Sequence, residues 1–129
     1  MNKKALTSGA FFAMLAVVLG AFGAHALKEK LPAEMLQAFE TGVRYQFYHS
    51  FALLVSGIIY QAFPNKNLKL AITFFIIGIG LFSGSLYVMA LLSMNGMSIG
   101  QAGIITPIGG LFFILGWVLM LLGVVKKNS

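Results

Sequence analysis

Residues 70–125 read LAITFFIIGIGLFSGSLYVMALLSMNGMSIGQAGIITPIGGLFFILGWVLMLLGVV. They form 56 consecutive uncharged residues between Lys69 and Lys126. An α-helix rises 1.5 Å per residue, so about 20 residues cross a hydrocarbon core of ~30 Å. This stretch is too long for one membrane crossing and predicts two. The break falls at residues 93–103, SMNGMSIGQAG, which hold three glycines and several polar side chains.

Two shorter uncharged runs precede this stretch, with 23 residues between Lys4 and Lys28 and 21 between Arg44 and Lys66. Together they predict an all-α integral membrane protein, a compact bundle of four transmembrane helices in one domain over residues 1–129. Thr106-Pro107 is typical of a helix start, with threonine as the cap and proline in the first turn. The predicted spans are about 6–27, 45–63, 70–92 and 105–125.

The composition of the 129 residues agrees with a membrane location. Hydrophobic residues are 59% and charged residues 9%, against roughly 25% charged in soluble domains. The chain has no cysteine and no aspartate, and its three glutamates are its only acids. This excludes disulfide frameworks, thiol catalysis and most paired-carboxylate chemistry. The basic residues form small groups rather than a stripe, which argues against nucleic-acid binding. No catalytic motif is present, so we predict a protein that is not an enzyme.

The distribution of lysine and arginine predicts the orientation in the membrane. Six lysines fall on one side of the four predicted spans. The other side carries Lys28, Lys30 and Arg44, which are offset by all three glutamates. We therefore expect a multi-pass protein of the bacterial inner membrane with both termini in the cytoplasm, where anionic lipids would be favourable partners. The six lysines are Lys3, Lys4, Lys66, Lys69, Lys126 and Lys127.

Residues 32–44, PAEMLQAFETGVR, have a different character. Apolar side chains recur on one helical face and polar side chains on the other, which predicts an amphipathic helix. The segment is either a separate helix at the outer interface or an extension that runs straight into the second span.

Glycine stripes are expected to hold the helices together, because lipid is as apolar as leucine and close packing requires small residues. One of these stripes could instead be a contact with a second copy of the chain or with a partner membrane protein. The packing candidates are Gly20, Gly23, Gly80, Gly84, Gly109, Gly116 and Gly123.

Polar side chains gather toward the outer ends of the spans, where such groups are costly and indicate function. Glu40 and Arg44 have i,i+4 spacing, which predicts an ion pair. His25 ends the first span and could approach His49 on the second. The candidate network is His25, Glu40, Arg44, Tyr45, Tyr48, His49, Ser83, Ser85, Tyr87 and Thr106.

Three interpretations of this network remain open. In the first, the side chains satisfy one another and the protein acts through helix packing or oligomerisation. In the second, the pocket around His25, Arg44 and His49 binds or transports a small ligand, such as an anionic lipid or a quinone. In the third, the two histidines ligate haem or a transition metal. The residues themselves favour the first interpretation and predict no cofactor.

Four ordered strings also resemble a known family. They are LGAFGAHALK (19–28), FETGVRYQFYHSFALL (39–54), LFSGSLYVMAL (81–91) and ITPIGGLFFILGW (105–117). They closely resemble the YgdD/YwdK-type small bacterial membrane proteins, known as domain of unknown function 423 and related to the eukaryotic transmembrane protein 256 group. The resemblance implies a four-span bacterial inner-membrane protein and no established reaction. It places the motif positions at His25, Thr41, Gly42, Tyr45, Gln46, Tyr48, His49, Ser83, Gly84, Ser85, Tyr87, Thr106, Pro107, Gly109, Gly110 and Trp117.

Overall fold

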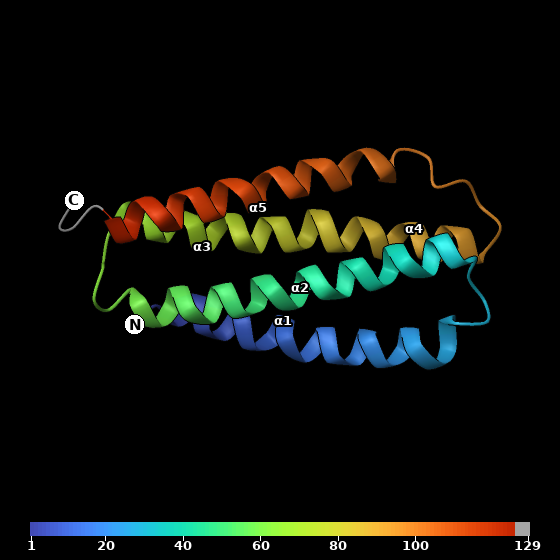
Figure 1. The fold of residues 1–129 in the computed structure, drawn as a ribbon, viewed down its shortest axis with the longest axis horizontal. Coiled ribbons are helices and arrows are strands. Elements are labelled where there is room, and N and C mark those ends of the chain that lie inside the picture. The colour runs from blue at the N-terminus through green and yellow to red at the C-terminus, as the bar shows by residue number, and fades with distance from the viewer. Residues whose placement is uncertain (126–129) are drawn as a thin grey trace.

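The computed structural model describes residues 1–125 as four long helical rods that lie side by side (Figure 1). The first rod is α1 (Lys3–Phe22), which continues through the π-helical turn η1 (Gly23–Leu27), and the second is α2 (Ala33–Ile59). The third rod comprises α3 (Lys66–Gly78), the π-helical turn η2 (Ile79–Ser83) and α4 (Gly84–Met94), and the fourth is α5 (Ala102–Val125). The start of α1 and the end of α5 lie at the same end of the bundle (Figure 1).

Three of the four rods are long and apolar enough to cross a membrane: Lys3–Leu27, Lys66–Met94 and Ala102–Val125. The rod α2 is not among these three, because its first half carries charged and amide side chains. The amphipathic segment at residues 32–44 forms no separate helix. It runs straight into the second predicted span, and the two make one 27-residue helix.

The predicted start of the last helix is wrong. The helix α5 begins at Ala102, so Pro107 lies inside it rather than in its first turn. Gly96 and Gly100 have φ angles of 70° and 56°, which glycine adopts without a Cβ clash. They let the chain turn between Met94 and Ala102. Because this connection is short, α5 starts one helical turn earlier than the sequence predicts.

Asparagine caps fix two helices at the end of the bundle that holds the N-terminus. The Asn2 side chain accepts a hydrogen bond from the Ala5 N–H at 3.0 Å, and Asn65 accepts one from the Leu68 N–H at 2.9 Å. Asn65 also donates to the Gly123 carbonyl at 2.9 Å, which joins the end of α5 to the start of α3.

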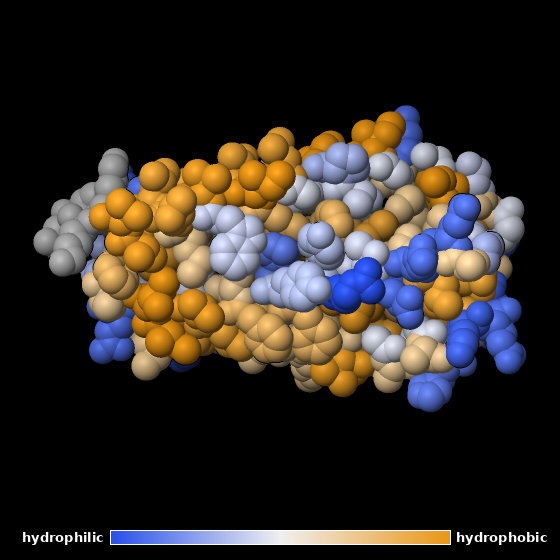
Figure 2. Space-filling view, viewed as in Figure 1, coloured by the Kyte–Doolittle hydropathy of each residue, from blue (hydrophilic) through white to orange (hydrophobic). Residues whose placement is uncertain are grey.

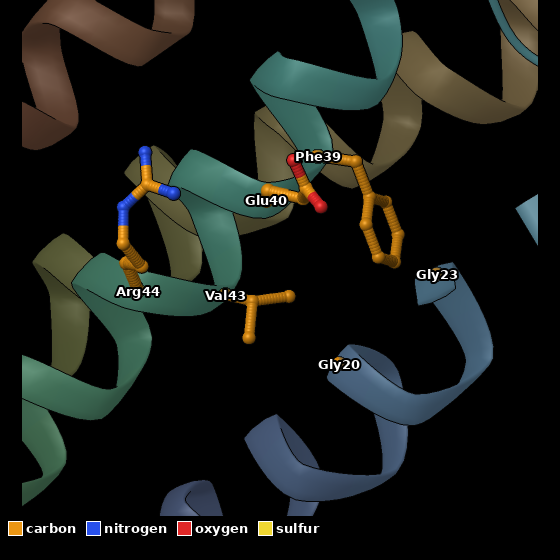
Figure 3. A pocket seen from close by; sticks show the side chains of 6 residues that line it. All are labelled: Gly20, Gly23, Phe39, Glu40, Val43 and Arg44. Carbon is orange, nitrogen blue, oxygen red and sulfur yellow. The ribbon is translucent and has the colours of Figure 1, made fainter. Parts of the chain in front are cut away.

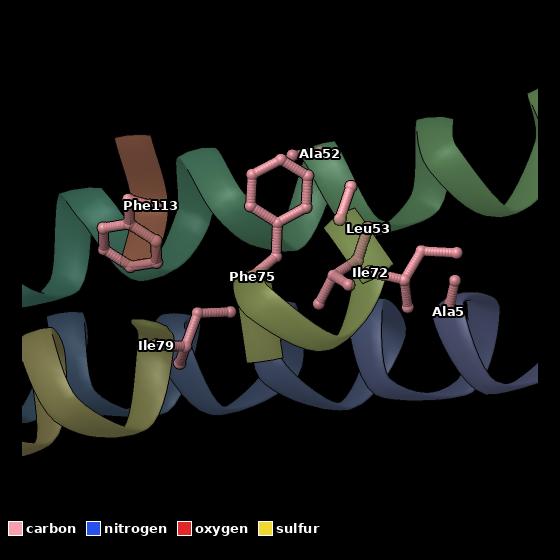
Figure 4. Close-up of a cluster of buried hydrophobic side chains, with 8 residues drawn as sticks. Ala5, Ala52, Leu53, Ile72, Phe75, Ile79 and Phe113 are labelled. Carbon is pink, nitrogen blue, oxygen red and sulfur yellow. The ribbon is translucent and has the colours of Figure 1, made fainter. Parts of the chain in front are cut away.

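Two apolar clusters fill the interior. The cluster drawn in Figure 4 brings together side chains of α1, α2, α3, η2 and α5 around Phe75, which has no exposed surface. The second cluster surrounds Phe39 and Val43 and lies toward the opposite end, where η1 joins α2. The polar side chains described below lie between and beside these clusters.

The glycines of α5 pack closely against the third rod and its Asn65 cap. A Cβ on Gly109 would lie 2.3 Å from the Phe82 backbone nitrogen, so α5 and η2 touch backbone to backbone. A Cβ on Gly116 would lie 2.7 Å from the Phe75 ring, and one on Gly123 would lie 3.0 Å from the Asn65 side chain.

The Gly80 and Gly84 pair makes no such contact. A Cβ on either residue would meet no atom within 4 Å, so this pair joins no helices within the bundle. Gly20 and Gly23 instead face α2, where their added Cβ atoms would lie 3.4 Å from Val43 and 2.7 Å from Phe39.

Candidate functional site: a polar layer and two grooves

Gln46 is the centre of the polar layer and joins three helical rods. Its side chain is 1% exposed. Its Nε2 donates to the Phe12 carbonyl of α1 at 2.8 Å, and its Oε1 accepts from the Tyr87 hydroxyl of α4 at 2.6 Å. The Ser50 hydroxyl donates to the Gln46 carbonyl at 2.6 Å. The amide has no charge, so its chemistry gives no signal in the sequence, and Gln46 is indicated only as a motif position of the family.

The hydroxyl groups of the third rod bind its neighbours. Ser83 is fully buried and donates to the Gly42 carbonyl of α2 at 2.6 Å. The hydroxyls of Ser85 and Thr106 form a hydrogen bond between α4 and α5. Ser83, Ser85 and Thr106 thus connect the third rod to α2 on one side and to α5 on the other.

His49 uses both of its ring nitrogens within the bundle. The Nδ1 atom lies 2.7 Å from the Tyr45 carbonyl, and the Trp117 Nε1–H donates to Nε2 at 3.0 Å. Because a carbonyl only accepts, these partners assign the proton to Nδ1 and the lone pair on Nε2 to Trp117. The ring also stacks on Phe113 with centroids 3.5 Å apart. No lone pair of this tautomer is free to bind a metal.

The structure does not bring His25 to His49. His25 is exposed in η1, next to Gly23, which packs on Phe39. His49 lies ten residues beyond Phe39 on α2, which is about 15 Å along the helix axis. A shared haem or metal between the two histidines therefore has no geometric support. The described residues also contain no cluster of three metal-ligating side chains.

Every buried side-chain nitrogen and oxygen in residues 1–125 has a hydrogen-bond partner. Partners of this kind remove the cost of placing polar groups inside a membrane. The polar layer therefore leaves no buried side-chain nitrogen or oxygen of these residues unpaired, and a ligand could bind only at the grooves beside it.

The first open surface, the α1/α2 groove, has a volume of about 270 Å³ and is shown in Figure 3. Glu40 and Arg44 flank it, but their side chains point apart (Figure 3). Arg44 donates instead to the Thr41 hydroxyl at 3.0 Å, and the expected Glu40–Arg44 ion pair is not formed. The groove is lined by Gly20, Gly23, Phe39, Glu40, Val43 and Arg44.

The second surface, the α2/α5 groove, has a volume of about 500 Å³ and is mostly aromatic. Tyr45, Tyr48 and Trp117 are 38%, 53% and 45% exposed, and the hydroxyls of both tyrosines make no hydrogen bond to a described residue. Figure 2 shows white and blue side chains across the middle of one face, between the largely orange left part and a right end that also carries many blue side chains. The groove is lined by Tyr45, Tyr48, His49, Gly110, Phe113, Ile114 and Trp117.

The fold and the polar layer define a class, a helical membrane protein with an internal hydrogen-bond network. Residues 19–110 match the family described as protein of unknown function (DUF423), and the chain belongs to this family. This agrees with the family suspected from the four strings.

The relatives have similar lengths. The chain is 43% identical to the UPF0382 membrane protein YwdK of Bacillus subtilis, over 92% of this chain and 93% of that one. It is 39% identical to a UPF0382 membrane protein of Haemophilus influenzae, over 100% and 99%. It is 36% identical to the UPF0382 inner membrane protein YgdD of Escherichia coli, over 85% and 80%. No solved structure matches the chain.

Proposed function

We propose that the protein is a four-span, non-enzymatic protein of the bacterial inner membrane, whose polar layer locks the bundle into one packing. The carrying observation is that all buried polar side chains of residues 1–125 are partnered within the chain. The rod α2 packs along α1 and along the third rod (Figure 1), and its His49 contacts Trp117 of α5. A bilayer that surrounds those three also surrounds α2, which supports a fourth span.

The proposed orientation puts both termini in the cytoplasm. Lys3, Lys4, Lys66 and Lys69 lie at one end of the bundle, in or near the first turns of α1 and α3. The predicted contribution of Lys126 and Lys127 lies outside the described residues. Because the chain has no cysteine, single-cysteine variants report topology cleanly. In intact cells, an impermeant thiol reagent is expected to label Ser98→Cys but not Ser129→Cys, and the reverse pattern would overturn the orientation.

The open glycine pair on the third rod supports a contact with a second copy of the chain. Gly80 and Gly84 have small-xxx-small spacing, which lets helices in a membrane approach closely, and a Cβ on either would meet no atom of residues 1–125 within 4 Å. Cross-linking in membranes is expected to capture a dimer that Gly80→Leu/Gly84→Leu abolishes. The control is Leu70→Ala, which changes another exposed side chain of the same rod.

A second candidate function is the binding of a flat, membrane-dissolved molecule with carbonyl acceptors, such as a quinone, in the α2/α5 groove. The supporting observation is that aromatic walls lie beside the exposed side chains of Tyr45 and Tyr48, whose hydroxyls make no hydrogen bond within residues 1–125. Mass spectrometry of gently solubilised protein tests it, because a stoichiometric quinone should disappear in Tyr45→Phe/Tyr48→Phe. The visible spectrum of the same sample is expected to lack a Soret band. A Soret band that His49→Ala removes would favour haem instead.

A further inference from the structure

A third groove, the α1/α3 groove, lies outside both surfaces discussed so far. Its volume is about 650 Å³, within the range of ligand-binding clefts. Its apolar part is formed by Phe11, Phe12 and Ile76. Phe12 and Ile76 pack on the central apolar cluster, while Phe11 is 52% exposed. The groove is lined by Lys3, Lys4, Thr7, Ser8, Phe11, Phe12 and Ile76.

The charged side chains that line this groove, within residues 1–125, are cations. Lys3 and Lys4 line it from α1, and Lys66 and Lys69 are exposed in the first turn of α3 on the other side. The Lys4 ammonium donates to the Thr73 hydroxyl of α3 at 3.5 Å, which holds the lysine across the opening. The three glutamates of the chain lie at residues 29–40, toward the opposite end of the bundle.

The cations and the apolar wall are separated along the helix axis. Phe11 lies seven residues after Lys4 on α1, and Ile76 lies seven residues after Lys69 on α3. Seven residues correspond to about 10 Å. A molecule that binds here therefore meets positive charge at the end of the bundle and an apolar surface about 10 Å deeper, which matches a phospholipid that stands along the bundle.

We propose that the α1/α3 groove binds an anionic phospholipid, with its phosphate at Lys3 and Lys4 and an acyl chain against Phe11, Phe12 and Ile76. Basic groups next to membrane helices attract anionic headgroups. Among the described residues, the lining of the groove has no carboxylate to receive the ammonium of a zwitterionic headgroup. It differs in this from the α1/α2 groove, where Glu40 lies beside Arg44.

Other occupants fit less well. An apolar helix of a partner protein would cover Lys3 and Lys4 without supplying a countercharge, which is costly in a membrane. A free phosphate would use the lysines and leave the apolar wall without a partner. The phospholipid alone satisfies both parts of the groove.

The experiment compares lipid retention by the full-length protein in mixed micelles of phosphatidylglycerol and phosphatidylcholine, measured by native mass spectrometry. We expect the parent protein to retain phosphatidylglycerol over phosphatidylcholine by about tenfold. Lys3→Gln/Lys4→Gln should bring this ratio close to one. The matched control is Lys28→Gln/Lys30→Gln, which removes the same charge from the opposite end and should keep the preference.

Two further variants separate the headgroup from the acyl chain. Lys4→Arg keeps the charge and should keep the preference for phosphatidylglycerol. Phe11→Ala alters an exposed side chain and should lower retention of both lipids equally. Excess inorganic phosphate should displace neither lipid.

An equal loss of preference in Lys28→Gln/Lys30→Gln would show a general charge effect and overturn the proposal. Displacement of phosphatidylglycerol by inorganic phosphate would also overturn it, because it would reveal an anion site without a lipid. The proposal requires a membrane-embedded bundle but not its orientation. A reversed thiol-labelling pattern would place the bound lipid in the other leaflet. It would not change the lipid retention expected in micelles.

Discussion

Gln46 and His49 lie within three turns of Glu40 and Arg44 on α2, yet the two pairs have opposite surroundings. Gln46 and His49 are 1% and 4% exposed and bind groups on other helices. Glu40 and Arg44 are exposed and form no ion pair with each other. Neutral groups thus hold the interior of the bundle, while charged groups remain at its surface, where they contribute little to stability.

The largest effect is expected at Gln46. Gln46→Leu removes both of its side-chain hydrogen bonds, so the Tyr87 hydroxyl loses its Gln46 partner and the Phe12 carbonyl keeps only its bonding within α1. We expect the free energy of unfolding to fall by about 2 kcal/mol, measured by denaturant unfolding in micelles. The double variant Gln46→Leu/Tyr87→Phe should lose less than the sum of its single changes. Gln61→Leu, at an exposed position just beyond α2, is the control. Equal stability of Gln46→Leu and the parent would contradict the proposed role of the polar layer.

The His49–Trp117 contact should have the next largest effect. Trp117→Phe leaves the His49 Nε2 without its donor and is expected to cost about 1 kcal/mol. The chain has one tryptophan, so its fluorescence reports this contact directly. His49→Leu should shift the emission to shorter wavelength, because the indole N–H loses its polar partner. Tyr48→Phe, the control, should leave the emission in place, and unchanged emission in His49→Leu would contradict the hydrogen bond.

Ser83→Ala is expected to have a smaller effect, a loss of about 0.6 kcal/mol, the average for hydrogen bonds between helices in membranes. The serine donates to the Gly42 carbonyl, which also belongs to the backbone of α2. When the serine hydroxyl is removed, the Gly42 carbonyl therefore keeps its backbone hydrogen bond within α2. Ser98→Ala, in the exposed connection before α5, is the matched control. A loss above about 2 kcal/mol would mean that Ser83 does more than bind this carbonyl.

The smallest effects are expected at the surface pair. Glu40→Gln and Arg44→Gln should each change stability by less than about 0.5 kcal/mol. Because the two side chains point apart (Figure 3), their double variant should be additive within about 0.5 kcal/mol. A coupling energy above about 1 kcal/mol would show that the two residues do pair in the membrane and would erase the contrast with Gln46 and His49.

The sequence predicted the number and approximate ends of the rods, because charged residues and a glycine-rich break separate them. It could not predict which residues face inward. The Gly80–Gly84 and Gly109–Gly116 spacings look equally suited to packing, but only the second pair meets a neighbour. The rotation of each rod depends on contacts with all the others, and local spacing does not carry that information.

Two further differences between the sequence-based predictions and the structure have local causes. The π-helical turns η1 and η2 shift the phase of side chains relative to a regular helix, so the faces of α3 cannot be extended to α4 with a 3.6-residue period. The i,i+4 spacing of Glu40 and Arg44 permits an ion pair. The Thr41 hydroxyl lies closer in sequence, however, and accepts a hydrogen bond from the Arg44 guanidinium. The central position of Gln46 could not be predicted from its chemistry, because an uncharged amide gives no titratable or catalytic signal.

Because of Pro107, α5 can span the membrane either with its whole length or with the part that begins at the proline. The whole helix has 24 residues and is about 36 Å long, whereas residues 107–125 alone measure about 28 Å. Because proline lacks an N–H, the Gly103 carbonyl has no partner at the next turn, and the turn before Pro107 can unwind with little loss of helical bonding. The contact of Gly109 with Phe82 lies beyond this point. We therefore expect α5 to adjust to bilayers of different thickness by unwinding or forming this turn without tilting. Unwinding would break the hydrogen bond between Thr106 and Ser85 but keep the contact of Gly109 with Phe82.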